Sequence, residues 1–299
     1  MKMKKSKVKC LLKRHLKSEL KMHPILNLVI SYLPSYFSGL RSKKLFDEIK
    51  TYCMFIGYPR SGHTLVGQLI DAHPDALISN ELNALKYVKA GFSREQIYSM
   101  IIKRSKEFAE QGNKRGRYSY IVPNQWQGRY RKLLVIGDKK GAGSATKFGI
   151  DTTLFNKFQK LININIKFIH VIRNPYDTIS SICKRYSDRK RREPDISEII
   201  NKYFLRCEYI MNLKKQIDTS ALLDIKHESL IKNSKDNVAK ICRFLGLEVL
   251  EDYVGDCASI IFTKPHKSRY ELEWTDELID IVKNRMTDFP FLQGYSFEE

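Results

Sequence analysis

The chain lacks the cysteine patterns of a metal site or a redox centre. Its six cysteines are scattered over 299 residues, with no C-x-x-C pair and no histidines clustered beside them. Structural zinc sites and thiol oxidoreductases need paired or clustered ligands. We therefore expect no bound metal. Isolated cysteines also fit a reducing compartment, which favours a cytoplasmic protein.

A long uninterrupted apolar run is also missing. The most apolar stretch, residues 24–40, is broken by Pro34 and by several Ser and Tyr residues. A membrane-spanning helix needs about 20 apolar residues, and the basic start has no signal-peptide cleavage site. We therefore interpret residues 1–50 as a basic, partly helical N-terminal extension. The alternative is a basic amphipathic segment that makes peripheral contact with an anionic membrane.

Acidic residues are scarce relative to basic ones. The chain has 53 Lys and Arg against 33 Asp and Glu, a formal net charge of +20. A surface of that sign attracts anions. The positive charge fits several anionic partners: nucleic acid, anionic lipid, a polyanionic glycan or a multiply charged nucleotide. It fits equally a lysine-rich surface that only contacts water.

Short apolar segments that favour strands alternate with segments of helical spacing. The expected strands cover residues 52–56, 133–136, 166–172 and 221–225, and helices are expected at 64–72 and 234–245. This alternation predicts an α/β fold with a mostly parallel sheet and ligands at the carboxyl ends of the strands. No repeat or linker interrupts residues 51–299, so we expect one domain there. A helical insertion at about 85–130 is expected to form an acceptor-side lid.

The first strand runs directly into a glycine loop. Residues 57–64 read G-Y-P-R-S-G-H-T, which has the spacing of a phosphate-binding P-loop before a helix. In that position backbone N–H groups and the helix dipole bind phosphate oxygens. His63 stands where a nucleotide triphosphatase has lysine, and a neutral imidazole does not supply that charge. The nearest cation is Arg60, inside the loop. The expected phosphate contacts are Arg60, Ser61, Gly62, His63 and Thr64.

A second motif follows the third strand. The strand ending at Ile172 leads into R-N-P-Y-D at residues 173–177 and then into a helix with two serines. An arginine at a strand end and a hydroxyl two turns into the next helix converge on one phosphate in this geometry. Arg173 and Ser181 are the expected pair, with Ser180 as the competing hydroxyl.

Together these motifs resemble those of the sulfotransferases. Residues 58–64 are similar to the 5′-phosphosulfate loop, closer to its carbohydrate-type form, and the pair Arg173 and Ser181 matches the 3′-phosphate motif. The resemblance implies a P-loop-like three-layer fold and 3′-phosphoadenosine 5′-phosphosulfate (PAPS) as donor. It also implies adenosine 3′,5′-bisphosphate (PAP) as product, a hydroxyl acceptor such as a carbohydrate, and no metal.

Further segments carry the same resemblance. Residues 224–230 and 241–247 look like two packing segments of these enzymes, and residues 264–269 look like the basic loop that closes over the nucleotide. The resemblance therefore adds Lys267, Ser268 and Arg269 to the expected donor contacts. The alternative for this loop is a basic turn facing solvent.

Sulfuryl transfer needs a base for the acceptor hydroxyl and positive charge near the transferring oxygens. Arg60 is placed to supply that charge. Carbohydrate-type members use a glutamate just past the strand after the phosphate loop, which matches Glu81, and His63 is the alternative base. Lys139 resembles the lysine of a G-D-K segment, with Lys140 as its alternative.

Two other function classes remain open from the sequence. A P-loop kinase would use ATP and a metal-linked acid such as Asp138. A non-enzymatic basic module would bind nucleic acid or membrane through charge alone and would show steep salt dependence. The missing P-loop lysine argues against the kinase. The basic module leaves both phosphate motifs unexplained, so we expect no nucleic-acid partner. The sequence names neither the acceptor nor the oligomeric state.

Overall fold

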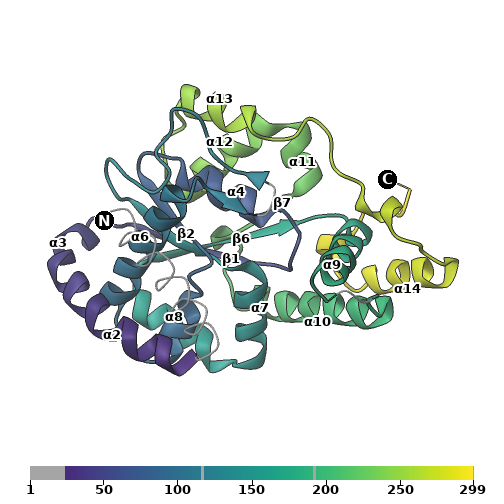
Figure 1. The fold of residues 1–299 in the computed structure, drawn as a ribbon, viewed down its shortest axis with the longest axis horizontal. Helices are drawn as coiled ribbons and strands as arrows, with labels where there is room; N and C mark the ends of the chain where they lie inside the picture. Colours follow the sequence, from purple (N-terminus) through teal and green to yellow (C-terminus); the bar gives the residue numbers. More distant parts are fainter. Residues whose placement is uncertain (1–23, 116–117, 191–192, 299) are drawn as a thin grey trace, which may run out of the picture.

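The computed structural model describes residues 24–115, 118–190 and 193–298. Its centre is a parallel five-stranded sheet in the order β2-β5-β1-β6-β7 (Figure 1). The strands are β1 Thr51–Ile56, β2 Ala76–Asn80, β5 Val135–Lys139, β6 Asn165–Ile172 and β7 Leu222–Lys226.

Helices cover both faces of this sheet and make three layers. The alternating side chains of β1 divide between two cores: Tyr52, Met54 and Ile56 join one, and Cys53 and Phe55 join the other. Since strand side chains alternate between faces, the two cores lie on opposite sides of the sheet. The predicted three-layer α/β fold is confirmed.

Each core has its own helices. The core of Cys53 and Phe55 is covered by α4 His63–Asp71, α11 His227–Lys232, α12 Ser234–Leu245 and α13 Glu251–Ser259. The core of Tyr52 is covered by α5 Ala84–Lys89, α6 Arg94–Glu110, α7 Gly141–Ile150, α8 Thr153–Ile162, α9 Pro175–Lys190, α10 Ile196–Lys214 and α14 Asp276–Met286. Three 3₁₀ turns complete the described structure: η1 Thr219–Ala221, η2 Ser268–Glu271 and η3 Pro290–Leu292.

Strand β5 begins later than its apolar residues indicate. The prediction placed it at 133–136, but the strand covers Val135–Lys139 and so includes the polar Asp138 and Lys139. Gly137 explains why the strand continues, because a Cβ there would lie 2.2 Å from the Cys53 backbone oxygen. The close approach of β1 and β5 therefore carries two charged side chains to the carboxyl edge of the sheet.

The segment after β2 is helical only in its first part. Helices α5 and α6 are followed by a short antiparallel hairpin, β3 Lys114–Arg115 and β4 Tyr118–Ser119, and then by residues 120–134 without regular structure. Beyond Glu110 the structure thus differs from the helical insertion expected at 85–130. The hairpin brings a basic side chain, Arg115, back toward the sheet.

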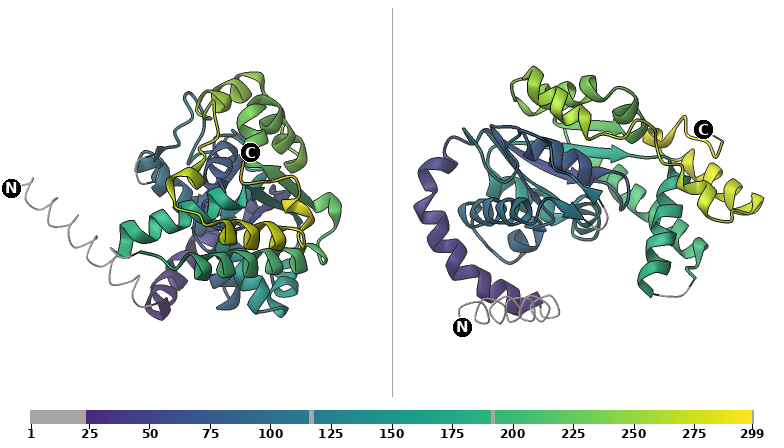
Figure 2. Two further views of the ribbon diagram at one scale, coloured as in Figure 1. Left: turned by 90° about the vertical axis from the view of Figure 1, so that its right-hand side faces the viewer. Right: turned by 45° about the horizontal axis from the view of Figure 1, so that its top comes forward.

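The N-terminal part of the chain is described from residue 24. Helix α2 Pro24–Arg41 contains Pro34 without ending there, and α3 Lys43–Phe46 leads into β1. The expectation of membrane contact through residues 1–23 lies outside the described residues. Helix α2 packs on α6 at the edge of the molecule (Figure 2). Among the described helices, none combines the length and the hydropathy that crossing a membrane requires.

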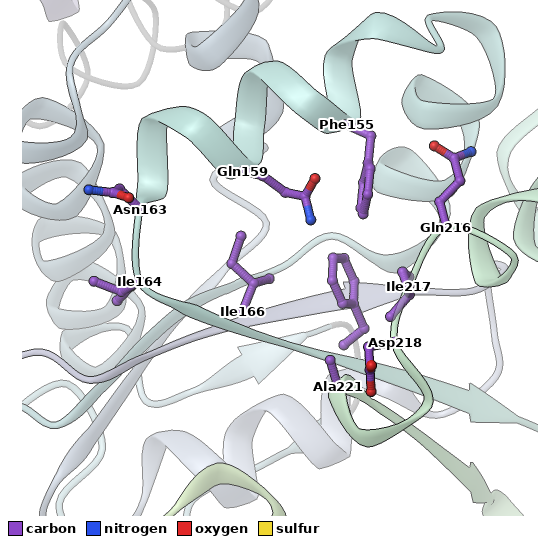
Figure 3. Close-up of a pocket in the computed structure, with 10 residues that line it drawn as sticks. Phe155, Gln159, Asn163, Ile164, Ile166, Gln216, Ile217, Asp218 and Ala221 are labelled. Carbon is purple, nitrogen blue, oxygen red and sulfur yellow. The ribbon is translucent and has the colours of Figure 1, made fainter.

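A cavity of about 400 Å³ lies at the amino end of β6. Its lining comes from α8, from the start of β6 and from the segment that leads into β7 (Figure 3). Ligands of open parallel sheets bind at the carboxyl ends of the strands. This cavity is at the other end of β6 from Arg173 and plays no part in the site described below.

Candidate functional site

The glycine loop joins β1 to α4 in a strained backbone path. Arg60 has φ 68°, and Gly62, the residue before α4, has φ 95°. A Cβ on Gly62 would also lie 2.4 Å from the Cδ2 atom of His227. Only glycine satisfies both conditions without strain. The loop therefore ends at a helix N-terminus, where backbone N–H groups are available to an anion.

Two side chains of the loop stabilise each other. Ser61 Oγ lies 3.2 Å from the Tyr58 carbonyl oxygen, to which it donates, and 3.1 Å from His63 Nδ1. Since the hydroxyl proton is given to Tyr58, the His63 Nδ1–H donates to Ser61 and the lone pair is left at Nε2. Burial, together with the Lys139 ammonium, lowers the pKa of His63 to about 3. His63 is therefore neutral at physiological pH.

The two predicted phosphate motifs meet in one corner. Arg60 Nε donates to Ser181 Oγ at 2.8 Å, and Arg173 Nη1 donates to the Arg60 carbonyl oxygen at 3.3 Å. Arg173 Nη2 also donates to Ser268 Oγ at 3.1 Å. We call Arg60, Arg173, Ser181 and Ser268 the donor corner. Its members come from three distant segments, and two of them are guanidinium groups that bind phosphate well.

Helix α9 offers Ser181 rather than Ser180 to this corner. Ser180 Oγ accepts a hydrogen bond from Trp274 Nε1 at 3.0 Å. The start of α9 is held by Glu228, whose carboxylate accepts from the Asn174 backbone N–H at 2.9 Å and from the Tyr295 hydroxyl at 2.8 Å. Glu228 thus holds the R-N-P segment, and in this geometry Ser181 contacts Arg60 while Ser180 contacts Trp274.

Of the three predicted donor contacts in the C-terminal basic loop, only Ser268 lies in the donor corner. Ser268 lies in the donor corner, whereas Lys267 is exposed. The Arg269 side chain is only 2% exposed and its Nε lies 3.3 Å from Asp177 Oδ1, while its Nη1 donates to the Ser296 carbonyl at 2.9 Å. The expectation of a nucleotide contact by Arg269 is not supported by this geometry. Arg269 instead ties the loop to the R-N-P-Y-D motif.

Asp138 shapes the turn that follows β2. Its carboxylate accepts from the backbone N–H groups of Leu82 and Ala84, both at 2.9 Å, and from Ser79 Oγ at 2.8 Å. The side chain is buried. These bonds hold Glu81 in the left-handed region at φ 61°. Asp138 is committed to this turn, so the geometry does not favour the kinase role considered for it.

Glu81 lies at the centre of an ionic cluster. Arg115 contacts both carboxylate oxygens, each at 2.8 Å, and the ammonium groups of Lys139 and Lys140 each lie 3.3 Å from one of them. We call these four residues the Glu81 cluster. Lys139 also donates to Thr64 Oγ1 at 3.1 Å, which connects the cluster to the phosphate loop.

The cluster shifts the titration of its own members. Burial raises the pKa of Glu81, but Lys139, Arg115 and Lys140 together outweigh it and hold that pKa well below its usual range. Burial lowers the pKa of Lys139 to about 8, against the opposing effect of Glu81. Glu81 is therefore a carboxylate at physiological pH, and Lys139 is an ammonium that loses its proton in mildly alkaline solution.

Arg115 is the member that the sequence does not reveal. It lies in the hairpin, 34 residues beyond Glu81, and no motif connects the two. Its only sequence signal is a positive charge within the segment expected on the acceptor side. Tyr120, just after the hairpin, lies near both Arg60 and Arg115, since both cations influence its titration.

A comparison with known protein families agrees with the second motif. Residues 158–252, which include Arg173 and Ser181, match the model described as Sulfotransferase family. This segment, about a third of the chain, is similar to the sulfotransferase family. No curated protein matches the chain in sequence.

Two solved sulfotransferase structures, STF1 and STF9, show the same fold. Sulfotransferase STF1 from Mycobacterium tuberculosis H37Rv is 12% identical, with 90% of this chain and 86% of that chain covered and a TM-score of 0.51. Sulfotransferase STF9 from Mycobacterium avium is 10% identical, with 86% and 81% covered and a TM-score of 0.50. Mouse sulfotransferase SULT7A1, solved in complex with PAP, is 17% identical, with 80% and 73% covered and a TM-score of 0.41.

Proposed function

We propose that this protein moves the sulfuryl group of PAPS to a hydroxyl of an acceptor, and that the acceptor is a carbohydrate. The observation that carries the proposal is the donor corner, in which Arg60 of the phosphate loop contacts Ser181 and Arg173 of the second motif. PAPS carries a phosphosulfate at one end of its ribose and a phosphate at the other. A site with two joined anion-binding motifs suits such a donor.

The donor would lie with its two charged ends on the two motifs. The 5′-phosphosulfate fits the backbone N–H groups of the loop at the start of α4, with Thr64 and Arg60 beside it. The 3′-phosphate fits Arg173, Ser181 and Ser268, which supply one charged and two neutral hydrogen-bonding groups. Charge-assisted hydrogen bonds of this kind are the strong ones in proteins.

We propose Glu81 as the base. The acceptor oxygen attacks sulfur, the bond between sulfur and the bridging phosphate oxygen breaks, PAP leaves, and the hydroxyl proton passes to the Glu81 carboxylate. Arg60 and Lys139 stabilise negative charge on the transferring oxygens. Glu81 is ionised at physiological pH and is held in an unfavourable backbone conformation, which is frequent at functional residues. An acceptor hydroxyl would replace one of the cations that now contact the carboxylate.

His63 is the alternative base, and its geometry supports it less. Its Nε2 lone pair is available, but the ring is buried within the loop and its Nδ1 is used to hold Ser61. Such contacts favour a role in shaping the loop.

A carbohydrate acceptor and a cytoplasmic location are also part of the proposal. The phosphate loop is closer to the carbohydrate-type form, and the excess of cations around Glu81 suits an acceptor that carries acidic groups. The five cysteines within the described residues are all buried and unpaired, which fits a reducing compartment.

A transfer assay tests the function. Full-length protein is incubated with radiolabelled PAPS and a panel of glycans, phenols, lipids and small alcohols, with and without EDTA. Arg60→Ala and Arg173→Ala should each lower kcat/KM by about a thousandfold or more, because each removes a charged group from the anion site. Circular dichroism checks that both variants are folded.

The matched control is Arg243→Ala, an exposed arginine on α12. It should leave transfer and PAP affinity unchanged. Near-normal transfer by either donor-corner variant would contradict the site, and a strict requirement for magnesium and ATP would contradict the reaction.

A further inference from the structure

Helix α2 has its polar and small residues turned toward the protein. Asn27, Ser31, Ser35 and Gly39 recur every four residues and so share one side of the helix. Asn27 Oδ1 accepts from the Tyr87 hydroxyl at 3.1 Å, and Ser35 Oγ accepts from Gln96 Nε2 at 3.2 Å.

Close packing extends along the same side. A Cβ on Gly39 would lie 3.0 Å from Glu95, so the helix and α6 touch at that point. A surface helix of a soluble domain normally buries its apolar side. In α2 that arrangement is reversed.

The opposite side of α2 is apolar and exposed. Ile25, Val29, Leu33 and Phe37, again four residues apart, are 57–77% exposed. Leu26, Ile30, Tyr36 and Leu40 form a second row beside them. Of the sixteen large hydrophobic residues that are exposed among the described residues, nine lie on α2 and the other seven are scattered over the remaining chain. Contiguous apolar surface of this kind marks a contact site.

The charges around α2 indicate what it contacts. The helix itself carries no acidic residue, and Arg41, Lys43 and Lys44 follow before the first acid, Asp47. In the sequence before it, residues 1–23 hold nine Lys and Arg against one acid, Glu19. An apolar stripe with cations at its ends is complementary to anionic headgroups above an acyl layer. A second copy of a chain with net charge +20 would instead bring like charges together.

We propose that the exposed side of α2, centred on Val29, Leu33 and Phe37, docks on an anionic lipid surface with the helix lying in the plane of the membrane. The apolar side chains enter the boundary between headgroups and acyl chains, and the flanking cations contact the headgroups. The helix is at the edge of the domain, on the side away from the sheet, so docking leaves the fold unchanged (Figure 2). This proposal does not depend on the proposed transfer reaction.

Vesicle sedimentation with the full-length chain tests it. Wild type and Leu33→Asp/Phe37→Asp are mixed with vesicles of phosphatidylcholine alone or of phosphatidylcholine with phosphatidylglycerol. The control, Leu205→Asp/Ile281→Asp, makes the same change at two exposed apolar residues of α10 and α14. Wild type and control should bind the anionic vesicles equally. The α2 variant should bind at least about tenfold more weakly, because two charged side chains replace two that enter the lipid.

Three results would overturn the proposal. Wild type that does not bind anionic vesicles excludes it. Undiminished binding by the α2 variant would show that the basic residues before α2 suffice without its apolar side. A wild-type dimer in analytical ultracentrifugation without lipid, lost in the α2 variant, would show that a second copy covers this surface. Circular dichroism spectra equal to wild type in both variants establish that they are folded.

Discussion

The donor corner and the Glu81 cluster lie at the same edge of one sheet, but different contacts hold them. In the donor corner, Arg60 and Arg173 follow directly from β1 and β6, and each strand places its arginine at the sheet's carboxyl edge. In the cluster, Lys139 is the last residue of β5 and Lys140 follows it, but Arg115 comes from a hairpin outside the five-stranded sheet. The two arginines of the donor corner are thus positioned by the strands that precede them, whereas the cluster depends on an ion pair with a hairpin outside the sheet.

This difference affects which property of the enzyme each part controls. The groups of the donor corner are positioned by backbone that is buried in the sheet and in α4 and α9. Glu81 is positioned by an unfavourable φ and by three cations that compete for two oxygens. We therefore expect the donor corner to control affinity for the donor, and the cluster to control the rate of transfer and its dependence on pH.

Of the substitutions compared below, replacing the candidate base Glu81 should have the largest effect on kcat, and replacing the alternative base His63 should have a much smaller one. Glu81→Gln keeps the size of the side chain and removes its basicity, so kcat should fall by about a hundred- to ten-thousandfold with little change in PAP affinity. His63→Asn should cost about tenfold at most, since the amide can still contact Ser61. Transfer rates and calorimetric PAP titrations measure the two quantities. The reverse order of rates would move the base to His63.

Removing Arg115 should have the next largest effect. Arg115→Ala deletes two charge-assisted hydrogen bonds to Glu81, and we expect kcat to fall by about ten- to a hundredfold. The pKa of Glu81 should also rise, because one of the cations that hold it down is gone. Glu81 must be ionised to act as base, so as the pH is lowered into the ordinary range of a carboxyl group, about 4 to 5, and below it, the variant should lose activity before the wild type does.

The pH dependence of kcat distinguishes an effect of Arg115 on Glu81 from a general loss of structure. The control is Arg129→Ala, an exposed arginine of the same insertion that stacks on Trp126 at 5.0 Å. It should keep the wild-type profile. An Arg115→Ala enzyme with a lower rate but an unshifted profile would show that Arg115 does not act through Glu81.

The places of Arg60 and Arg173 in the fold could be predicted because the information for them is local. Strand, loop and helix follow one another within a few residues at both Arg60 and Arg173, so the pattern alone indicates where each arginine ends up. The Glu81 cluster was only partly predictable. Glu81 and Lys139 follow strands, but Arg115 reaches them through a hairpin in a segment that was expected to be helical.

Two other details needed three-dimensional contacts. The choice between Ser180 and Ser181 depends on Trp274, which lies 94 residues further along the chain. The inward direction of Arg269 depends on Asp177 and on the C-terminal Ser296. The exposed apolar side of α2 was also hidden in the sequence, because its regular apolar spacing is equally typical of a helix that packs on a core.

The two adjacent serines of α9 allow a direct comparison of PAP affinity, with a smaller expected effect. Ser181→Ala should weaken PAP binding by about tenfold, the cost of one hydrogen bond to a charged phosphate. Ser180→Ala is the matched control one residue away, and its hydroxyl serves Trp274 instead. It should change PAP affinity by less than about twofold. Equal losses in the two variants, measured by calorimetry, would mean that α9 presents both hydroxyls to the donor.

Alkaline pH should lower kcat of the wild-type enzyme itself, by a factor similar to or smaller than the loss of PAP affinity in Ser181→Ala. The pKa of Lys139 is lowered to about 8, so its ammonium is mostly protonated at pH 7 and mostly neutral at about pH 9. If the ammonium stabilises the transferring oxygens, kcat should fall by about five- to tenfold over that range while PAP affinity changes little. Lys140→Gln should keep this alkaline decrease, since Lys139 still titrates, whereas Lys139→Met should start from a lower rate and show none. A rate that stays constant to about pH 9 in wild type would place Lys139 outside the chemistry, and the cluster would then act on the acceptor through Glu81 alone.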